Sequence, residues 1–242
     1  MKKIGIIFLI IISFVACKKM GTPEPEINNS NNVGPSTYGD LEILFVKEYK
    51  KNILIGSDSI VISSFYDKLA DGVSPVNYVN AGNVSYNSIG LKPSATYYRD
   101  TTHLINVHSQ NSIWSVSGNA SVAAFSYTFT PSFPVFSGNA QLPDSISLFH
   151  GFTVNITGLS NMTESSIPVT ISDGITNITK SIPINQKSVT FSHDDLSSLT
   201  TTPSGASFIV TFSNISNQTF GGKVYGIINT LEHIKHGIKI KS

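Results

Sequence analysis

The chain has 242 residues, of which 16 are Lys or Arg and 15 are Asp or Glu. Charged residues make up 13%, about half the share in an average globular protein. So few cations exclude an extended nucleic-acid-binding surface, because such binding depends on clustered Lys and Arg. Hydrophobic residues make up 40%. This apolar content with so little charge excludes disorder for most of the chain. Ser, Thr and Asn dominate the polar remainder and favour strands and turns over helices, which excludes coiled coil.

The first segment has the pattern of a secretory signal peptide. Lys2 and Lys3 precede an apolar run that is too short for a membrane-spanning helix of about 20 residues. The run ends near Ala16, a small residue of the kind that processing sites require. Residues 1–16 are therefore predicted to be removed, which leaves 14 basic against 15 acidic residues in the mature chain.

Cys17, the only cysteine, directly follows this segment. The sequence Phe14-Val15-Ala16-Cys17 resembles the lipobox of bacterial lipoproteins, with Phe14 in place of the usual Leu. The resemblance implies that residues 1–16 are a lipoprotein signal peptide and that Cys17 is acylated, with palmitate as one of its chains. Two or more acyl chains would hold the protein stably at a membrane.

Residues 17–36 are predicted to form the lipidated cysteine and a flexible tether, because they lack a hydrophobic period and are rich in Asn, Pro and Gly. Lys18 and Lys19 would each gain about 1 kcal/mol beside anionic lipid. The start of the chain resembles lipoproteins of the Bacteroidota, in which acidic residues close to the cysteine accompany surface export. Here Glu24 and Glu26 come late. The expected location is the outer membrane, facing either the periplasm or the cell surface.

From Thr37 onward, apolar and polar residues alternate, for example at 41–46, 152–157 and 169–172, which predicts β-strands. Turn signals such as Asp173-Gly174 separate the strands. Only 194–199 has the start of a helix, with room for about one turn. The predicted fold class is all-β.

Pro131 to Pro134 opens the densest run of strand-breaking residues and predicts a domain boundary. Residues 37–131 and 132–242 are then two tandem β-sandwich domains, each close to the ~100 residues of an immunoglobulin-like sandwich. The C-terminal one resembles a bacterial immunoglobulin-like domain, although it lacks the cysteine pair of antibody domains. Its strands are expected at 152–157, 167–173, 176–184, 187–192, 206–213, 219–230 and 233–241. The N-terminal one could instead be a jelly roll or a carbohydrate-module-like sandwich, and one large sandwich is a further alternative.

Tyr97-Tyr98-Arg99-Asp100 is the strongest candidate for ligand binding. Adjacent strand residues face opposite sides of a sheet, so one tyrosine should be exposed for stacking, with Arg99 and Asp100 as polar groups beside it. The alternative is that one tyrosine lies in the core, the other at the rim, and Arg99 pairs with an acid. Trp114 is expected in the core.

Three Asp-Ser or Asp-Thr pairs resemble the pattern at which Bacteroidota attach O-linked glycans to exported proteins. They imply modification at Ser59, Thr101 and Ser145.

No spacing typical of a metal site is present. His103 and His108, and likewise His233 and His236, would face apart in strands. No cofactor is expected.

Catalytic patterns are equally absent. Asp67, Asp71 and Asp100 could act on a glycosidic bond only if the fold brought two of them together. His193-Asp194-Asp195 is better explained by a turn between sheets than by catalysis. We therefore predict that the protein is not an enzyme and has no catalytic residue.

The last segment, Lys223–Lys241, ends in alternating Ile and Lys, which predicts an edge strand protected by lysines. A strand donated to a partner, as in fimbrial assembly, is the rival interpretation. Two-domain lipoprotein pilins of the Bacteroidota resemble this layout.

The predicted function is that of a non-catalytic, membrane-anchored envelope lipoprotein that binds or scaffolds a glycan or a protein partner. Two alternatives stay open, a polysaccharide-acting enzyme and a structural subunit of a fimbria-like assembly. The membrane is expected as a partner through the lipid anchor, and nucleic acid is not.

Overall fold

The described part of the chain is built almost entirely of β-strands, which confirms the all-β prediction. The computed structural model describes residues 37–70, 75–102, 107, 111–200 and 205–241. The predicted signal peptide, Cys17 and tether lie outside these residues, as do Asp71, His103 and His108. The helices in these ranges are the 3-10 turn η1 (Asn139–Gln141) and α1 (His193–Leu196), and none is long and apolar enough to cross a bilayer.

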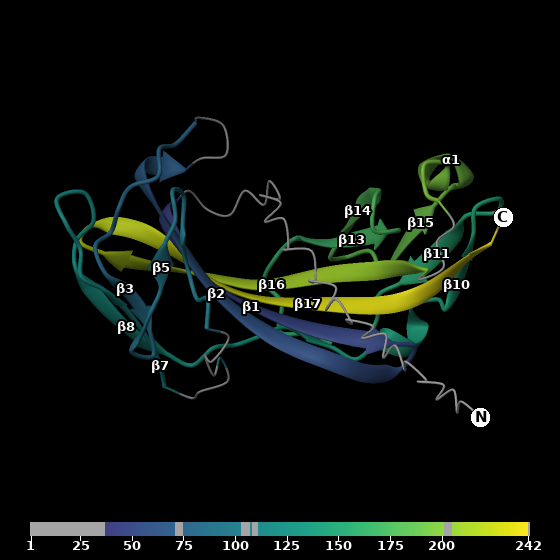
Figure 1. Cartoon of the computed structure of the whole chain (residues 1–242), viewed down its shortest axis with the longest axis horizontal. Coiled ribbons are helices and arrows are strands. Elements are labelled where there is room, and N and C mark those ends of the chain that lie inside the picture. The colour runs from purple at the N-terminus through teal and green to yellow at the C-terminus, as the bar shows by residue number, and fades with distance from the viewer. Residues whose placement is uncertain (1–36, 71–74, 103–106, 108–110, 201–204, 242) are drawn as a thin grey trace, which may run out of the picture. The chain divides into compact units, whose positions relative to one another are not determined.

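Four long strands form the middle of a nine-stranded sheet (Figure 1). They are β1 (Thr37–Lys50), β2 (Ile53–Ala70), β16 (Ala206–Phe220) and β17 (Lys223–Lys241). Each of β1–β2 and β16–β17 is an antiparallel hairpin, and β1 pairs in parallel with β17 from Asp40↔Gly226 to Lys50↔His236. The first and last strands described are therefore neighbours in the middle of the sheet.

Shorter strands complete this sheet on both sides. The order is β14-β13-β16-β17-β1-β2-β6-β5, with β10 paired to the end of β17. Their bounds are β5 (Lys92–Pro93), β6 (Tyr98–Arg99), β10 (Ser145–Ser147), β13 (Ser166–Ser172) and β14 (Asn177–Pro183).

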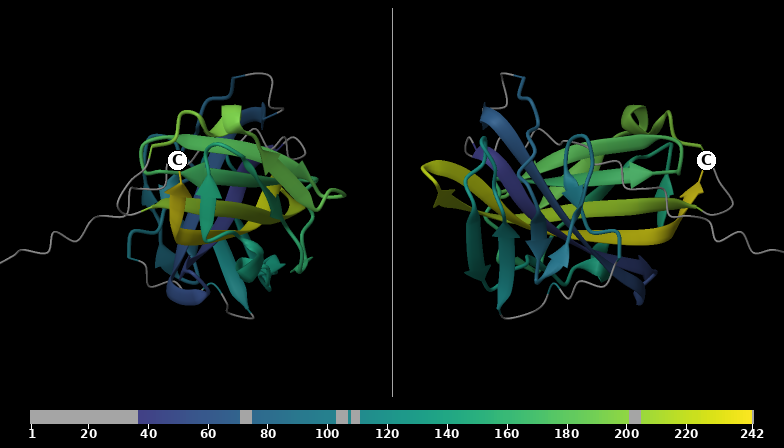
Figure 2. Two further views of the ribbon diagram at one scale, coloured as in Figure 1. Left: turned by 90° about the vertical axis from the view of Figure 1, so that its right-hand side faces the viewer. Right: turned by 60° about the vertical axis from the view of Figure 1, so that its left-hand side comes forward.

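Three small sheets lie against the large one (Figure 2). One has the order β4 (Ile89–Gly90), β3 (Val84–Tyr86), β7 (Ser112–Val116) and β8 (Phe125–Phe129). The others pair β11 (Phe152–Asn155) with β15 (Ser188–Phe191), and β12 (Leu159–Ser160) with β9 (Val135–Phe136).

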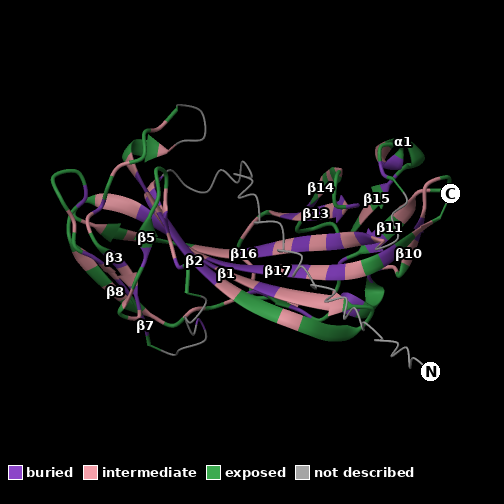
Figure 3. Ribbon diagram, viewed as in Figure 1, coloured by how far each residue is buried: buried purple, intermediate pink, exposed green. Residues whose placement is uncertain are grey.

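Two apolar clusters lie along one face of the long strands. Ile227 and Leu231 of β17 are an even number of residues apart and so share a face, which their register partners Leu41 and Phe45 of β1 also share. Ile227 belongs to a cluster with residues of β3 and β7, and Leu231 to a cluster with residues of β11, β13 and β15. Phe45 packs against both. The alternation of buried and half-buried residues along these strands is visible in Figure 3.

Strands from both sides of the expected boundary at 131/132 share the large sheet. The apolar cluster that includes residues of β3 and β7 consists mainly of residues before 131, but it also contains Tyr225 and Ile227. The division into two sandwich domains stays a prediction.

The predicted strand over 219–230 is wrong, because Gly221 and Gly222 end β16 and start a hairpin. Their φ angles of 56° and 78° are both positive, as the type I′ turn of a two-residue hairpin requires. Alternation continues on both sides of the glycines and so conceals the reversal.

The prediction of a C-terminal edge strand is also wrong. β17 pairs with β16 on one side and with β1 on the other, and its last residues pair with β10. The alternating lysines, Lys239 and Lys241, are exposed but occupy only the last residues of β17. From Tyr225 to Lys235, every second residue of the strand is buried. In one version of the fimbrial alternative, β17 is donated to a partner. That version needs an unpaired C-terminal strand, whereas β17 is paired on both sides.

Candidate ligand-binding site

A pocket of about 250 Å³ lies beside β6. Its walls come from two segments, 78–80 and the short β5–β6 hairpin, and its lining residues are Phe65, Tyr78, Val79, Asn80, Pro93, Ser94, Ala95, Thr96, Tyr97 and Tyr98. None of these lining residues is charged, so the chemistry on offer consists of aromatic rings, hydroxyls and one amide. Two of the sequence-predicted residues, Tyr97 and Tyr98, are among them.

The floor of the pocket is part of the core. Tyr98 and Phe65 are buried and pack edge to face, with ring centroids 5.9 Å apart. The Ala81 amide donates to Tyr98 Oη at 2.8 Å, and that hydroxyl donates to Asn80 Oδ1 at 3.1 Å. β6 is also held to β2 through the Ser63↔Tyr98 pair. Tyr98 is thus a fixed structural residue, as the core-and-rim alternative expected.

Another lining residue, Tyr78, has an exposed side chain. Tyr78 is 38% exposed and packs edge to face on Tyr66, with centroids 5.5 Å apart. Tyr66 in turn donates its hydroxyl to Asp40 Oδ2 at 2.9 Å. Asn77, next to Tyr78, donates its backbone amide and its side-chain amide to the two carboxylate oxygens of Asp67. These hydrogen bonds lower the pKa of Asp67 and hold Tyr78 in place.

The opposite wall is the β5–β6 hairpin. The Ser94 amide donates to the Tyr97 carbonyl at 2.7 Å, which closes the turn. Ser94, Ala95 and Thr96 are exposed, and Tyr97 is half-buried. Sequence reasoning found this wall, but it missed Tyr78 and Asn80. They reach the pocket because Val79 pairs with Phe65 of β2, through an amide-to-carbonyl bond of 2.9 Å.

Arg99 and Asp100 lie outside the pocket lining. Arg99 is half-buried and pairs with Ile62 of β2 in the sheet register. Asp100 is buried, and its Oδ1 accepts from the amide and the hydroxyl of Thr102 at 2.8 and 2.6 Å. The predicted cluster is therefore divided, with two residues in the pocket and two beside it.

The predicted glycosylation positions differ in access. Thr101 is exposed, whereas Ser59 in β2 and Ser145 at the start of β10 are half-buried. Their modification stays a prediction.

His233 and Lys235 form a buried polar cluster on the core face of β17. His233 Nε2 lies 2.9 Å from Asn139 Oδ1, and Tyr49 stacks on the imidazole at 4.4 Å. Burial lowers the pKa of His233 to about 4, and the positive charges of Lys47 and Lys235 contribute. The imidazole is therefore neutral near pH 7.

Lys235 Nζ donates to the Leu142 carbonyl at 2.5 Å and pairs with Asp144 Oδ1 at 2.9 Å. Together with His233 it fastens η1 to the sheet. His236 contacts Glu48 on the other face, so the two histidines do face apart. Within the ranges that the structure covers, no three His, Cys, Asp or Glu side chains are grouped as a metal would require.

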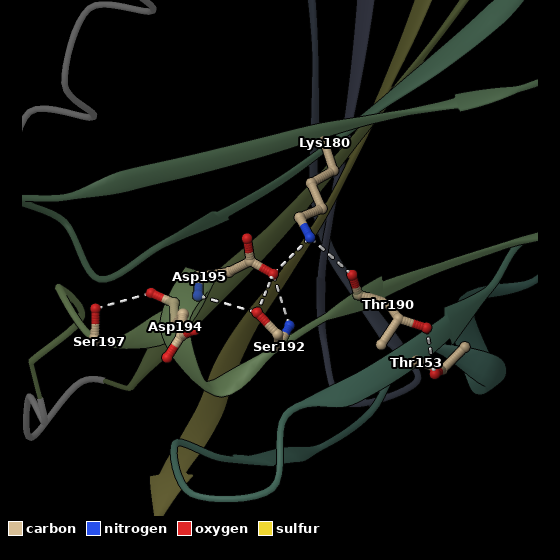
Figure 4. Close-up of polar contacts among 7 residues, drawn as sticks. All are labelled: Thr153, Lys180, Thr190, Ser192, Asp194, Asp195 and Ser197. Carbon is tan, nitrogen blue, oxygen red and sulfur yellow. Dashed lines mark hydrogen bonds and ion pairs between the residues drawn. The ribbon is translucent and has the colours of Figure 1, made fainter.

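His193-Asp194-Asp195 is the start of helix α1. Figure 4 shows the polar contacts of Ser192 and Asp195, which cap this helix. Ser192 accepts from the Asp195 amide, and Asp195 Oδ2 accepts from the Ser192 amide at 2.6 Å and from Lys180 Nζ at 2.5 Å. The bonds from Lys180 and Ser192 lower the pKa of Asp195 to about 2. These groups are used in capping the helix and in joining it to β14.

A row of acids that sequence reasoning missed lies on the face of the sheet opposite to the two clusters. Asp40 and Glu42 are two residues apart on β1, and the Thr230 hydroxyl donates to Glu42 Oε1 at 3.2 Å. Burial raises the pKa of Glu42 to about 7, and the nearby acids Asp40, Glu164 and Glu232 add to the rise. The signal was present in the sequence, because Asp40 and Glu42 alternate with Leu41 and Ile43.

No protein-family model, curated protein or solved structure matches the chain.

Proposed function

We propose that the chain is a non-catalytic envelope lipoprotein that binds one uncharged sugar residue of a glycan in the pocket beside β6. The observation that carries the proposal is the lining of this pocket, whose residues include three tyrosines together with hydroxyl- and amide-bearing residues and no charged residue. Tyr97 and Tyr98, expected from the sequence to belong to a binding site, are both in the lining.

The ligand class follows from this chemistry. A pyranose ring has an apolar face that stacks on aromatic rings and a rim of hydroxyls that exchange hydrogen bonds with side chains. The lining tyrosines Tyr78, Tyr97 and Tyr98 are the candidates for the ring, and Ser94, Thr96 and Asn80 are the candidates for the polar groups. At about 250 Å³ the pocket is smaller than the ~300 Å³ at which drug-sized sites begin, so it suits one ring of a longer chain.

The pocket is also preorganised for a ligand. Tyr78 is held by Tyr66, and the floor is held by the bonds of Tyr98. A rigid site loses less side-chain freedom when it binds. A peptide that inserts an apolar side chain is the competing occupant.

A neutral-glycan array followed by titration calorimetry tests the site. Tyr78→Ala should weaken binding of the selected glycan about two- to tenfold, because the stacking surface is lost, whereas Tyr78→Phe should bind nearly as well as the original chain. Ile175→Ala, at an 85% exposed position outside the lining, is the matched control. Equal affinity of the Tyr78→Ala protein, or an array without any neutral ligand, would refute the proposal.

Two further assays of the purified protein, product analysis of the selected glycan and SDS electrophoresis, separate the alternatives. Shortening of the glycan by the purified protein would favour a polysaccharide-acting enzyme. Polymers that survive SDS would favour a fimbria-like subunit.

The anchor is a separate part of the proposal and rests on the lipobox resemblance at Cys17. We expect labelled palmitate to enter the protein in cells and the protein to fractionate with the outer membrane. Cys17→Ala should abolish both. Incorporation of label into the Cys17→Ala chain would contradict acylation at this residue.

A further inference from the structure

The tip of the β1–β2 hairpin exposes three aliphatic residues in succession. Ile53, Leu54 and Ile55 are 69%, 52% and 54% exposed. Lys50 and Lys51, which precede them with Asn52 in between, are exposed as well. Among the described residues, the other exposed large hydrophobic side chains are single in the sequence.

The tip is held in this position by the rest of the sheet. Asn139 Nδ2 donates to the Lys51 carbonyl at 2.9 Å and to Asn52 Oδ1 at 3.2 Å. Asn139 is itself buried and bonded to His233. The exposure of the three aliphatic residues is therefore a property of an anchored turn.

The backbone at this tip is poorly suited to adding a strand. β1 and β2 pair as Tyr49↔Leu54 and then as Glu48↔Gly56, so Ile55 is an extra residue in the ladder. Such bulges twist an edge and disfavour pairing with another chain. A contact between the tips of two copies would also bring the lysines of both together.

We propose that the segment Lys50–Ile55 inserts its aliphatic side chains into an anionic lipid surface. Aliphatic side chains gain free energy on leaving water, and lysines beside them are attracted to anionic headgroups while their stems stay in the interface. This contact goes beyond the proposed function. It requires the proposed location at a membrane, but neither acylation of Cys17 nor the sugar pocket.

A label at the tip tests the contact in the full chain. In a Cys17→Ser background, Leu54→Cys is labelled with an environment-sensitive fluorophore and mixed with vesicles of phosphatidylglycerol and phosphatidylcholine. The emission should shift to the blue and be quenched by a lipid-borne quencher. Both changes should be much smaller with vesicles of pure phosphatidylcholine. Ile175→Cys, labelled in the same way, should show neither change. Because the label reports its own surroundings, attachment of the vesicle elsewhere on the chain does not imitate insertion.

A second set of variants measures the contribution of the side chains. The double variant Ile53→Ser with Ile55→Ser should reduce the part of vesicle cosedimentation that depends on the tip about tenfold. The double variant Lys50→Gln with Lys51→Gln should reduce it by a similar factor on anionic vesicles. Ile175→Ser with Ile184→Ser is the matched control, and thermal melting checks that each variant folds.

Three outcomes would overturn the inference. They are an unshifted label at position 54 with anionic vesicles, an equal shift on neutral vesicles, and a shift that grows with protein concentration without lipid, which would indicate a second copy. A Tyr78→Ala chain that inserts normally would separate this contact from the sugar site, and palmitate incorporation would report on Cys17 alone.

Discussion

The two faces of the paired strands β1 and β17 treat charge in opposite ways. On the core face, His233 and Lys235 are buried, and burial lowers the pKa of His233. On the opposite face, Glu42 and Glu232 are half-buried, and burial raises the pKa of both. Register explains the separation, because residues one apart on a strand face opposite sides.

Burial alone therefore does not determine the effect of pH on stability. Burial disfavours the charged form on either face, so it favours a neutral imidazole on one face and a protonated carboxyl on the other. Acid should therefore destabilise the fold through His233, and base should destabilise it through Glu42. The size of each contribution can be measured at Lys235, His233 and Glu42.

The largest effect is expected at Lys235, a buried residue whose Nζ bonds the Leu142 carbonyl and pairs with Asp144. Lys235→Ala removes the partner of the Leu142 carbonyl and leaves a cavity, so it should lower the free energy of unfolding by about 3 kcal/mol or more. Urea denaturation near pH 7 measures it. Lys239→Ala, at an exposed position of the same strand, should stay within about 0.5 kcal/mol of the original chain. A small loss at Lys235 would mean that η1 is held by other contacts.

His233 should make the fold sensitive to acid. Its pKa is about 4 in the folded state and 6.5 ordinarily, so the unfolded chain takes up the proton first as the pH falls. Stability is fully present above about pH 6.5 and should decline by about 3 kcal/mol towards pH 4. His233→Gln removes this titration and should flatten the pH profile in that window, as measured by urea denaturation at several pH values. An unchanged slope would place the acid sensitivity elsewhere.

Glu42 should have the opposite sign and a smaller effect. Its folded pKa of about 7 exceeds the ordinary 4.5, so stability is present below about pH 4.5 and is lost as the pH rises through 7. Glu42→Gln should therefore stabilise the protein by about 2 kcal/mol at pH 8.5 and have little effect at pH 4. Asp67→Asn is the control of opposite sign, because hydrogen bonds lower the pKa of Asp67. Destabilisation of the Glu42→Gln protein at high pH would show that Thr230 or a neighbour needs the carboxylate.

The strands could be predicted from sequence because alternation is a local property. Residues 152–157 and 167–173 were expected as strands and appear as β11 and β13 with shifts of a few residues. The parallel pairing of β1 with β17 could not be predicted, because a period of two identifies a buried face but not the neighbouring strand. The glycine pair at 221–222 was missed for a related reason, since the pattern of faces is the same before and after the turn.

Half of the candidate site followed from neighbouring residues in the sequence. Tyr97 and Tyr98 are adjacent, so alternation alone predicted one buried and one accessible ring. Tyr78 and Asn80 come from a different segment, and only the bond between Val79 and Phe65 brings them to the same pocket. Arg99 seemed a partner for the same ligand because it is adjacent in sequence, but the sheet directs it to Ile62.

The parallel contact between β1 and β17 also constrains how the chain can fold. During synthesis from the N-terminus, the chain can form the β1–β2 hairpin early. The other edge of β1 has no native neighbour until the β16–β17 hairpin has been made. Closing this contact requires a loop that spans nearly the whole described chain, and such non-local pairing makes folding slow. Until then β1 exposes an unpaired edge, so nascent and C-terminally truncated chains should depend on chaperones far more than the finished protein does.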